Sequence, residues 1–508
     1  MRVRLLATVL VAASAGTAGA EVRLPKVLSD HAVLQRERPI HVWGWATPAA
    51  HLRASFHGQT VQAIADARGA WSVYLQPEHA GGPYALKISG DGADVVVSDL
   101  LIGDVWIASG QSNMEFPLQG FGPTTPLKDQ EKEIAAGTNP KLRLLIVDKK
   151  SSDTPVNDIA RGWSQCTPET ARNFSAVAYF FGREIAAKED VPVGLVDATW
   201  GGTPADSWVS MNTLGTNAQL LPAFAERALF ADQQTDLEAT QAEEKHEDDE
   251  AKSKGQPSPR HSWHPFEMSW LPAGLYNGMI APLTPMSVRG FVWYQGESNS
   301  TSERAPYYEA LFRALIGDWR VHFAQGRLPF LFVQISSFNS PGEEWGTIRD
   351  AQRRVLDVDG TAMAVSLDVG TADNVHPPDK QTIGNRLALA ARNIVYGEST
   401  HYEGPTFREA TTELTPDGET AMRVWFDHAA GLSFHGHAAT GFELAGADHR
   451  FVLANATVQG ATVLVKSASV PHPLYVRFAW NSVVENSLYN NDGLPASTFT
   501  SEPSPLHR

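Results

Sequence analysis

Four short polar segments of this chain each follow an apolar, strand-like run and contain residue types that acyl transfer requires. They supply a serine hydroxyl, a pair of glycines with bare backbone amides, side-chain amides, and a carboxylate near an imidazole, in the segments 110–113, 200–208, 295–299 and 373–377. Loops at the carboxyl ends of strands in an open α/β sheet gather at one edge. We therefore expect these four segments to converge on one site.

The residue types predict how such a site would work. A serine hydroxyl becomes a nucleophile when an imidazole removes its proton, and the imidazole needs a carboxylate to hold its tautomer and stabilise its charge. Ser112 lies directly after an apolar strand, and Asp373 and His376 are three residues apart in a proline-bounded loop. We expect Ser112 to be the nucleophile, His376 the base and Asp373 the orienting carboxylate.

The tetrahedral intermediate of acyl transfer needs hydrogen-bond donors, each of which contributes about 3 kcal/mol to the transition state. We expect the backbone amide of Ser112 and that of Gly201 or Gly202 to supply them, with a side-chain amide from Gln295 or Asn299. Each segment alone has a plainer interpretation, because a serine in a glycine-rich turn is usually a capping or turn residue. Agreement among four separate strand ends favours catalysis.

The centre of the chain has the alternating pattern of an α/β fold. Apolar strand candidates occupy 102–109, 191–199, 288–294, 329–336 and 362–368. Helical periodicity follows Pro306 and also covers 175–189 and 382–395. This alternation predicts a parallel sheet flanked by helices.

Short β-branched runs separated by Gly, Pro and Asp predict a β-sandwich or jelly-roll region at each end of the chain. We place the N-terminal β region at 21–98, the α/β domain at 99–400 and the C-terminal β region at 401–508. The C-terminal strands form a second unit or complete the first one in space. A charged segment at about 232–262 is predicted to be a solvated insertion in the α/β domain.

The first twenty residues have the pattern of a secretory signal peptide, in which Arg2 and Arg4 precede an apolar run and Ala18-Gly19-Ala20 offers a cleavage site. We expect a soluble protein that is secreted or periplasmic, with no membrane contact after cleavage. Its net charge is −16, or −18 without those two arginines. This charge disfavours nucleic acid as a partner. The sequence does not give the oligomeric state.

We expect neither a metal nor an organic cofactor. Cys166 is the only cysteine, and its neighbours offer nothing to activate a thiol, so we expect it to be buried and inert. His246 lies in a charged run without chelating spacing, and we expect a solvated surface there. His428, His435 and His437 have a spacing that could ligate zinc, but we expect surface residues on a β-rich unit.

The blocks "GQSNMEFPL", "GGTPADSW", "WYQGESN" and "DNVHPPDK" together resemble those of sialate O-acetylesterases in the SGNH hydrolase superfamily. The resemblance extends to blocks near both ends of the mature chain and leaves out the charged insertion. It implies the same roles for Ser112, His376 and Asp373, and an oxyanion-hole amide from Gly201 or Gly202. It also implies removal of O-acetyl groups from a saccharide, such as sialic acid or the plant polysaccharide xyloglucan.

Residues around these blocks are candidates for binding the acetylated saccharide. We assign Gln111, Asn113, Trp208 and Glu297 to this role, and Glu297 could instead fix its own loop. Other tryptophans that could stack on sugar rings or belong to the core are Trp200, Trp263, Trp293 and Trp345. Arg349 and Gln352, one helical turn apart, face the cleft or support it.

Two other functions remain open from the sequence. In one, the β regions bind glycan and the α/β domain is catalytically silent, so that the protein is a carbohydrate-binding protein. In the other, the protein is a lipase or thioesterase, although the sequence has no long apolar segment that would form a lid. Turnover of a chromogenic acetyl ester would distinguish an esterase from a carbohydrate-binding protein. A preference for long acyl chains over acetyl would indicate a lipase or thioesterase.

Overall fold

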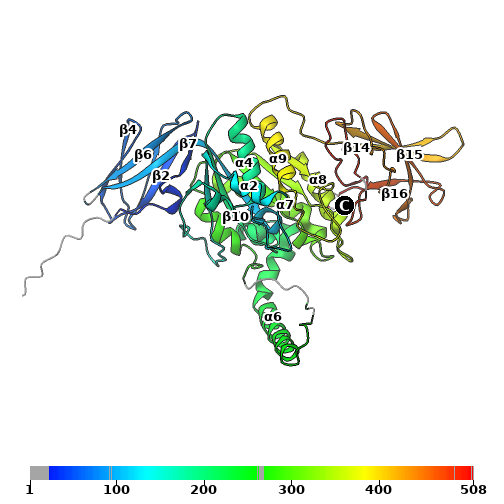
Figure 1. The fold of residues 1–508 in the computed structure, drawn as a ribbon, viewed down its shortest axis with the longest axis horizontal. Coiled ribbons are helices and arrows are strands. Elements are labelled where there is room, and N and C mark those ends of the chain that lie inside the picture. Colours follow the sequence, from blue (N-terminus) through cyan, green and yellow to red (C-terminus); the bar gives the residue numbers. More distant parts are fainter. Residues whose placement is uncertain are drawn as a thin grey trace, which may run out of the picture.

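The computed structural model describes residues 22–90, 92, 94–259, 261, 268–485, 487–504 and 506, with the backbone alone at 228–238. The predicted signal peptide and Trp263 lie outside the described residues. A central α/β domain has one β unit at each end of the molecule (Figure 1). The N-terminal and C-terminal β strands therefore form separate units, which answers the question that the sequence left open.

The central sheet has the strand order β13-β12-β11-β7-β10-β8-β9. Its strands are parallel except for β9, which pairs with β8 in the antiparallel sense. The bounds are β7 Val95–Gly110, β8 Asn139–Ile146, β9 Ser164–Cys166, β10 Val193–Thr199, β11 Gly290–Tyr294, β12 Phe330–Gln334 and β13 Thr361–Val365. All five predicted strands are present, whereas β8 and β9 were not predicted. The fold is the α/β class that the sequence predicts.

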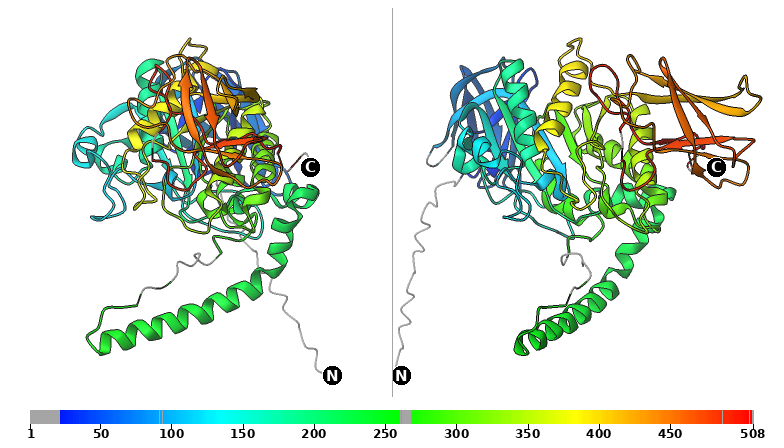
Figure 2. Two further views of the ribbon diagram at one scale, coloured as in Figure 1. Left: turned by 90° about the vertical axis from the view of Figure 1, so that its right-hand side faces the viewer. Right: turned by 45° about the vertical axis from the view of Figure 1, so that its right-hand side comes forward.

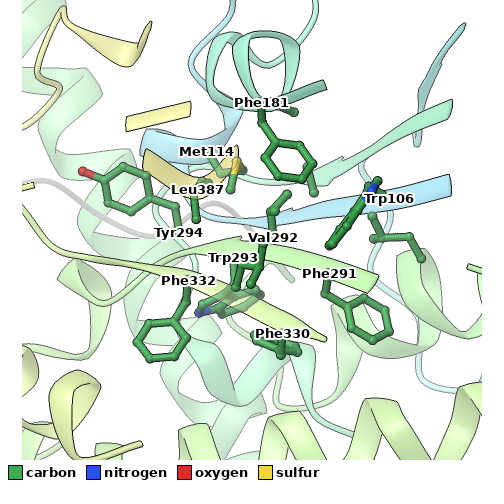
Figure 3. Close-up of a cluster of buried hydrophobic side chains, with 14 of the residues drawn as sticks. Trp106, Met114, Phe181, Phe291, Val292, Trp293, Tyr294, Phe330, Phe332 and Leu387 are labelled. Atoms are coloured by element: carbon green, nitrogen blue, oxygen red, sulfur yellow. The ribbon is translucent and has the colours of Figure 1, made fainter. Parts of the chain in front are cut away.

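Helices cover both faces of this sheet. Trp106 of β7 packs against Phe181 of α4 on one face (Figure 3). Phe291 of β11 packs against Trp319 of α7 on the other face. The four main helices are α4 Ala176–Lys188, α7 Tyr308–Phe323, α8 Trp345–Arg354 and α9 Lys380–Ile394. Strands covered on both faces are apolar throughout rather than alternating, and every residue of β10, β11, β12 and β13 is buried.

The N-terminal β unit continues directly into the central sheet through β7. The first part of β7 pairs with β6 and β1, and its second part pairs with β10 and β11. The domain boundary that we placed after residue 98 thus falls inside one continuous strand. The other strands of the unit are β1 Val33–Gln35, β2 Ile40–Trp45, β3 His51–Phe56, β4 Gln59–Ile64, β5 Ala70–Leu75 and β6 Gly81–Ser89.

The C-terminal unit consists of two four-stranded antiparallel sheets with the orders β14-β15-β19-β18 and β17-β16-β20-β21. The first contains β14 Thr406–Leu414, β15 Thr420–Asp427, β18 Asn455–Gln459 and β19 Thr462–Lys466. The second contains β16 Phe442–Ala445, β17 Val452–Leu453, β20 Tyr475–Phe478 and β21 Phe499–Thr500. Phe407, Phe442 and Phe478 pack around Phe499, so the two sheets share one apolar core.

A long helix, α6 Leu221–Ser253, covers most of the charged insertion and projects away from the body of the molecule (Figures 1 and 2). The helix starts about ten residues before the insertion that we predicted. Within the described part of the chain, no helix has both the length and the apolar character needed to cross a membrane.

Candidate active site

The serine that the sequence singles out begins a four-residue helix, α1 Ser112–Glu115, immediately beyond the end of β7. Met114 anchors this turn by entering the core below it (Figure 3). Gln111 is buried on the other side, where its Oε1 accepts the backbone N–H of Ser298 at 3.1 Å. Ser112 itself is half-buried, and its hydroxyl makes no hydrogen bond to the residues that the structure describes. The turn is therefore fixed while its hydroxyl is left free.

Asn113 joins the serine turn to the two other loops of the site. Its Nδ2 donates to Glu297 Oε1 at 2.6 Å and to the carbonyl oxygen of Val375 at 3.0 Å. Its Oδ1 accepts a hydrogen bond from Lys380 Nζ at 2.5 Å. Because Asn113 is fully buried with its polar atoms all bonded to protein, it has a structural role here in place of the substrate contact that we expected.

The glycine loop after β10 touches the serine turn. A methyl group at Gly201 would lie 3.2 Å from Ser112 Cβ, so only a glycine allows this approach without displacement. The Gly201 N–H donates to Glu115 Oε2 at 2.5 Å, while Glu115 Oε1 accepts from Lys149 Nζ at 2.7 Å. The Gly201 N–H is thus already bonded, whereas the Gly202 N–H has no acceptor within the described part of the chain.

The two side-chain amides that we considered for the oxyanion hole are both used inside the protein. Gln295 donates to Asn299 Oδ1 at 2.7 Å and to the carbonyl oxygen of Thr203 at 3.2 Å. Asn299 accepts the N–H of Ala205 at 2.8 Å and donates to Asp206 Oδ2 at 3.1 Å. Neither side chain is exposed. Their hydrogen bonds fasten the glycine loop to the loop after β11.

His376 lies on the loop before α9, next to the carbonyl that Asn113 binds. The ring of Phe121 stands edge-on to its imidazole with centroids 5.1 Å apart, and Phe116 lies behind at 6.2 Å. Burial, reinforced by the nearby charge of Lys380, lowers the pKa of His376 to about 4. The imidazole is therefore neutral at neutral pH, as a general base must be.

Asp373 is exposed, and no hydrogen bond or ion pair joins its carboxylate to His376. The imidazole of His376 and the hydroxyl of Ser112 are likewise not hydrogen-bonded to each other, although their loops are in contact through Asn113. The loop is instead held by its own turn, in which the His376 N–H donates to Asn374 Oδ1 at 2.9 Å. The structure brings together the serine turn, the glycine loop, the Gln295 loop and the histidine loop.

Most of the tryptophans that we considered for sugar stacking belong to the core. Trp208 and Trp293 are fully buried and meet edge to face at 6.2 Å. Trp345 is buried and donates its indole N–H to the carbonyl oxygen of Ser336. Trp200 is only partly buried, with Lys149 Nζ 6.0 Å from its ring. In this structure Trp208 therefore offers no ring face to a sugar, contrary to our expectation.

Arg349 and Gln352 of α8 bind backbone groups of the loops that follow β11 and β12. Arg349 is fully buried and donates to the carbonyl oxygens of Ile335, Ser336, Asn481 and Ser482, which ties α8 to the C-terminal unit. Gln352 donates to the Gln295 carbonyl oxygen at 2.9 Å and accepts the Ile335 N–H at 3.0 Å. Of the two roles open from the sequence, both residues take the supporting one.

Sequence reasoning missed three charged residues of the site, namely Glu115, Lys149 and Lys380. Glu115 and Lys380 each lie only three or four residues beyond a predicted catalytic residue, which is the one signal that could have found them. Glu297 is half-buried and accepts a hydrogen bond from Asn113, and burial of its carboxyl group raises the pKa of that group. It fixes its loop, which is the alternative that we gave for it.

The lone cysteine is buried, as the sequence predicts. Cys166 is 3% exposed, and burial raises its pKa to about 12. Among the described residues, no three side chains of the types His, Cys, Asp and Glu are grouped to hold a metal. His428 pairs with Glu403 at 2.9 Å, and His435 stacks on Tyr489 with ring centroids 4.5 Å apart.

Comparison with known proteins gives this site its family. The family model described as "Carbohydrate esterase, sialic acid-specific acetylesterase" matches residues 262–393. The sialate O-acetylesterase of Rattus norvegicus is 31% identical over 447 residues, which cover 79% of each chain. The human sialate O-acetylesterase is 29% identical over 433 residues, covering 77% of this chain and 74% of its own.

A solved structure agrees with these relatives. The crystal structure of a carbohydrate acetylesterase from Xanthomonas citri is 36% identical, with a TM-score of 0.80, and the match covers 95% of this chain and all of the other. The fold, the site and these relatives define a carboxylic ester hydrolase on a helix-flanked α/β sheet. The chain belongs to the sialate O-acetylesterase family.

Proposed function

We propose that this protein is a serine esterase that removes O-acetyl groups from saccharides, with Ser112 as nucleophile and His376 as general base. The observation that carries the proposal is the Asn113 side chain, which bonds the loop of His376 to the turn of Ser112 at 3.0 Å. It joins the turn that carries the Ser112 hydroxyl to the loop that carries the neutral imidazole of His376. Relatives named as sialate O-acetylesterases and a carbohydrate acetylesterase support the choice of substrate.

The proposed reaction has two steps. His376 takes the Ser112 proton as the hydroxyl oxygen attacks the acetyl carbonyl, and the N–H groups of Ser112 and Gly202 stabilise the oxyanion. The C–O bond to the sugar then breaks, and the sugar oxygen takes the proton from His376. In the second step His376 deprotonates a water that attacks the acetyl-enzyme, and the proton returns to Ser112 as acetate leaves.

Asp373 has a secondary part in this mechanism. We propose that its carboxylate orients the imidazolium during catalysis, because hydrogen bonds in an unliganded site often tighten only in the reacting complex. Its exposure in the free enzyme means that a large part of the rate survives without it. Asp373→Ala should therefore cost less activity than His376→Ala.

The test is acetate release from acetylated sialic acid, an acetylated xyloglucan oligosaccharide and acetylated xylan. Ser112→Ala should abolish release while thermal unfolding stays as in the wild type, and the exposed Ser302→Ala serves as the matched control. His376→Ala should be nearly as damaging. Full activity of Ser112→Ala would refute the mechanism, and preferential release of long acyl chains would indicate a lipase or thioesterase.

A further inference from the structure

A buried lysine lies at the centre of the contacts that assemble the site. Lys380 is the first residue of α9, is fully buried, and donates its Nζ to Asn113 Oδ1 at 2.5 Å. Its ammonium also stands 4.9 Å from the ring of Phe116 and 5.6 Å from that of Tyr294. A buried charge is costly unless it is compensated. A buried lysine only four residues after His376 is therefore expected to have a specific role.

The chemistry of its partners shows what the lysine does. An amide oxygen only accepts hydrogen bonds, and an amide nitrogen only donates them. Lys380 therefore holds the amide oxygen of Asn113, while Glu297 holds the amide nitrogen. These two hydrogen bonds fix the orientation of the amide group. The second hydrogen of Nδ2 then points at the carbonyl oxygen of Val375 and donates to it. The lysine thus fixes the orientation of the amide that joins the two catalytic loops.

We propose that Lys380 is a positioning residue of the esterase reaction, which through Asn113 holds the serine turn against the histidine loop. This inference rests on the proposed function. Lys380 donates its hydrogen bond to Asn113, so in this proposal it acts through the geometry of the two loops. Loss of a contact of this kind displaces reacting atoms by a fraction of an ångström to an ångström, which can cost up to about 100-fold in rate.

The charge of Lys380 has a second, separable effect on His376. His376 faces Lys380 of α9 and the uncharged rings of Phe116 and Phe121, and Glu297 is the charged group that acts on Lys380. Burial lowers the pKa of Lys380 to about 7, so the ammonium is charged at the acidic pH where His376 titrates. Removal of this charge must then raise the pKa of His376.

The experiment compares three variants with the wild type on a chromogenic acetyl ester, with kcat and KM measured from pH 3.5 to 8. Lys380→Met should lower kcat about 10- to 100-fold with little change in KM. It should also move the midpoint of the acid limb upward by about 0.5 to 1 pH unit. Asn113→Ala should lower kcat similarly without moving the acid limb, because the charge remains. The double variant should lose no more than the worse single one.

A matched control is Lys128→Met, since Lys128 pairs with the neighbouring Asp379 at 3.0 Å but is exposed. It should leave kcat and the acid limb unchanged. If Lys380→Met does not fold, Lys380→Arg keeps the charge and should keep the acid limb in place. The inference fails if Lys380→Met lowers only the melting temperature, or if losses in the double variant add. Failure of the proposed function would be seen separately, as an inactive wild type or a fully active Ser112→Ala.

Discussion

Gly201 lies so close to the nucleophile that a single methyl group should disturb catalysis. An alanine Cβ there would lie 3.2 Å from Ser112 Cβ and 3.1 Å from Glu115 Oε2. Carbon atoms in ordinary contact are about 3.5 Å or more apart. Gly201 has no positive φ, so alanine can adopt its backbone conformation and the effect is purely steric.

The size of the effect on kcat depends on how far Ser112 and Glu115 can move away from the added methyl group. Glu115 is held by Lys149 and by the Gly201 N–H, and Ser112 is held by Met114 below it, so neither side yields freely. We expect Ser112 to retreat by about 0.3 Å. We expect kcat to fall about 10-fold, equivalent to about 1.4 kcal/mol. The free energy of unfolding should fall by about 1 kcal/mol, the low end for overpacking.

The assay is initial-rate hydrolysis of a chromogenic acetyl ester, together with urea denaturation of each variant. Gly317→Ala is the control, because Gly317 is exposed in the middle of α7 and a Cβ there meets no atom within 4 Å. It should keep full kcat and gain about 0.5 to 1 kcal/mol of stability. Gly201→Ala with unchanged kcat and stability would refute the argument that close approach to Ser112 requires this glycine.

Three other properties can be measured with the same protein. Arg349→Met removes four hydrogen bonds to carbonyl oxygens, two of them buried, so the free energy of unfolding should fall by about 2 to 4 kcal/mol in urea titrations. Because the pKa of His376 is lowered to about 4, kcat/KM should stay near its plateau at pH 5.5 and fall only near pH 4; a midpoint near 6.5 would contradict this. Cys166 should resist alkylation by iodoacetamide in the native protein and react only after unfolding, as mass spectrometry can show.

Local sequence patterns were enough to predict the elements of the α/β domain. Strands such as β11 and β12 are continuous apolar runs because helices cover them on both faces. Helix α7 has an apolar stripe because only one of its faces is buried. Parallel strands bring their carboxyl ends to one edge, so convergence of the four loops also followed from the sequence. The strands β8 and β9 were missed because Pro140, Lys141 and Arg143 interrupt the apolar pattern of β8 and because β9 has only three residues.

The function of each polar side chain within the site was decided only by the tertiary structure. Gln295, Asn299 and the Gly201 N–H all looked available in the sequence, yet each is bonded to a partner from another loop. Trp208 follows the glycine loop but enters the core.

Hydrogen bonds and burial depend on neighbours that are distant along the chain, as between Lys380 and Asn113, which are 267 residues apart. The sequence alone therefore determined which chemical groups reach this edge of the sheet. Packing of the loops determined which of those groups remain free to act, because a donor or acceptor that is buried must find its partner within the protein.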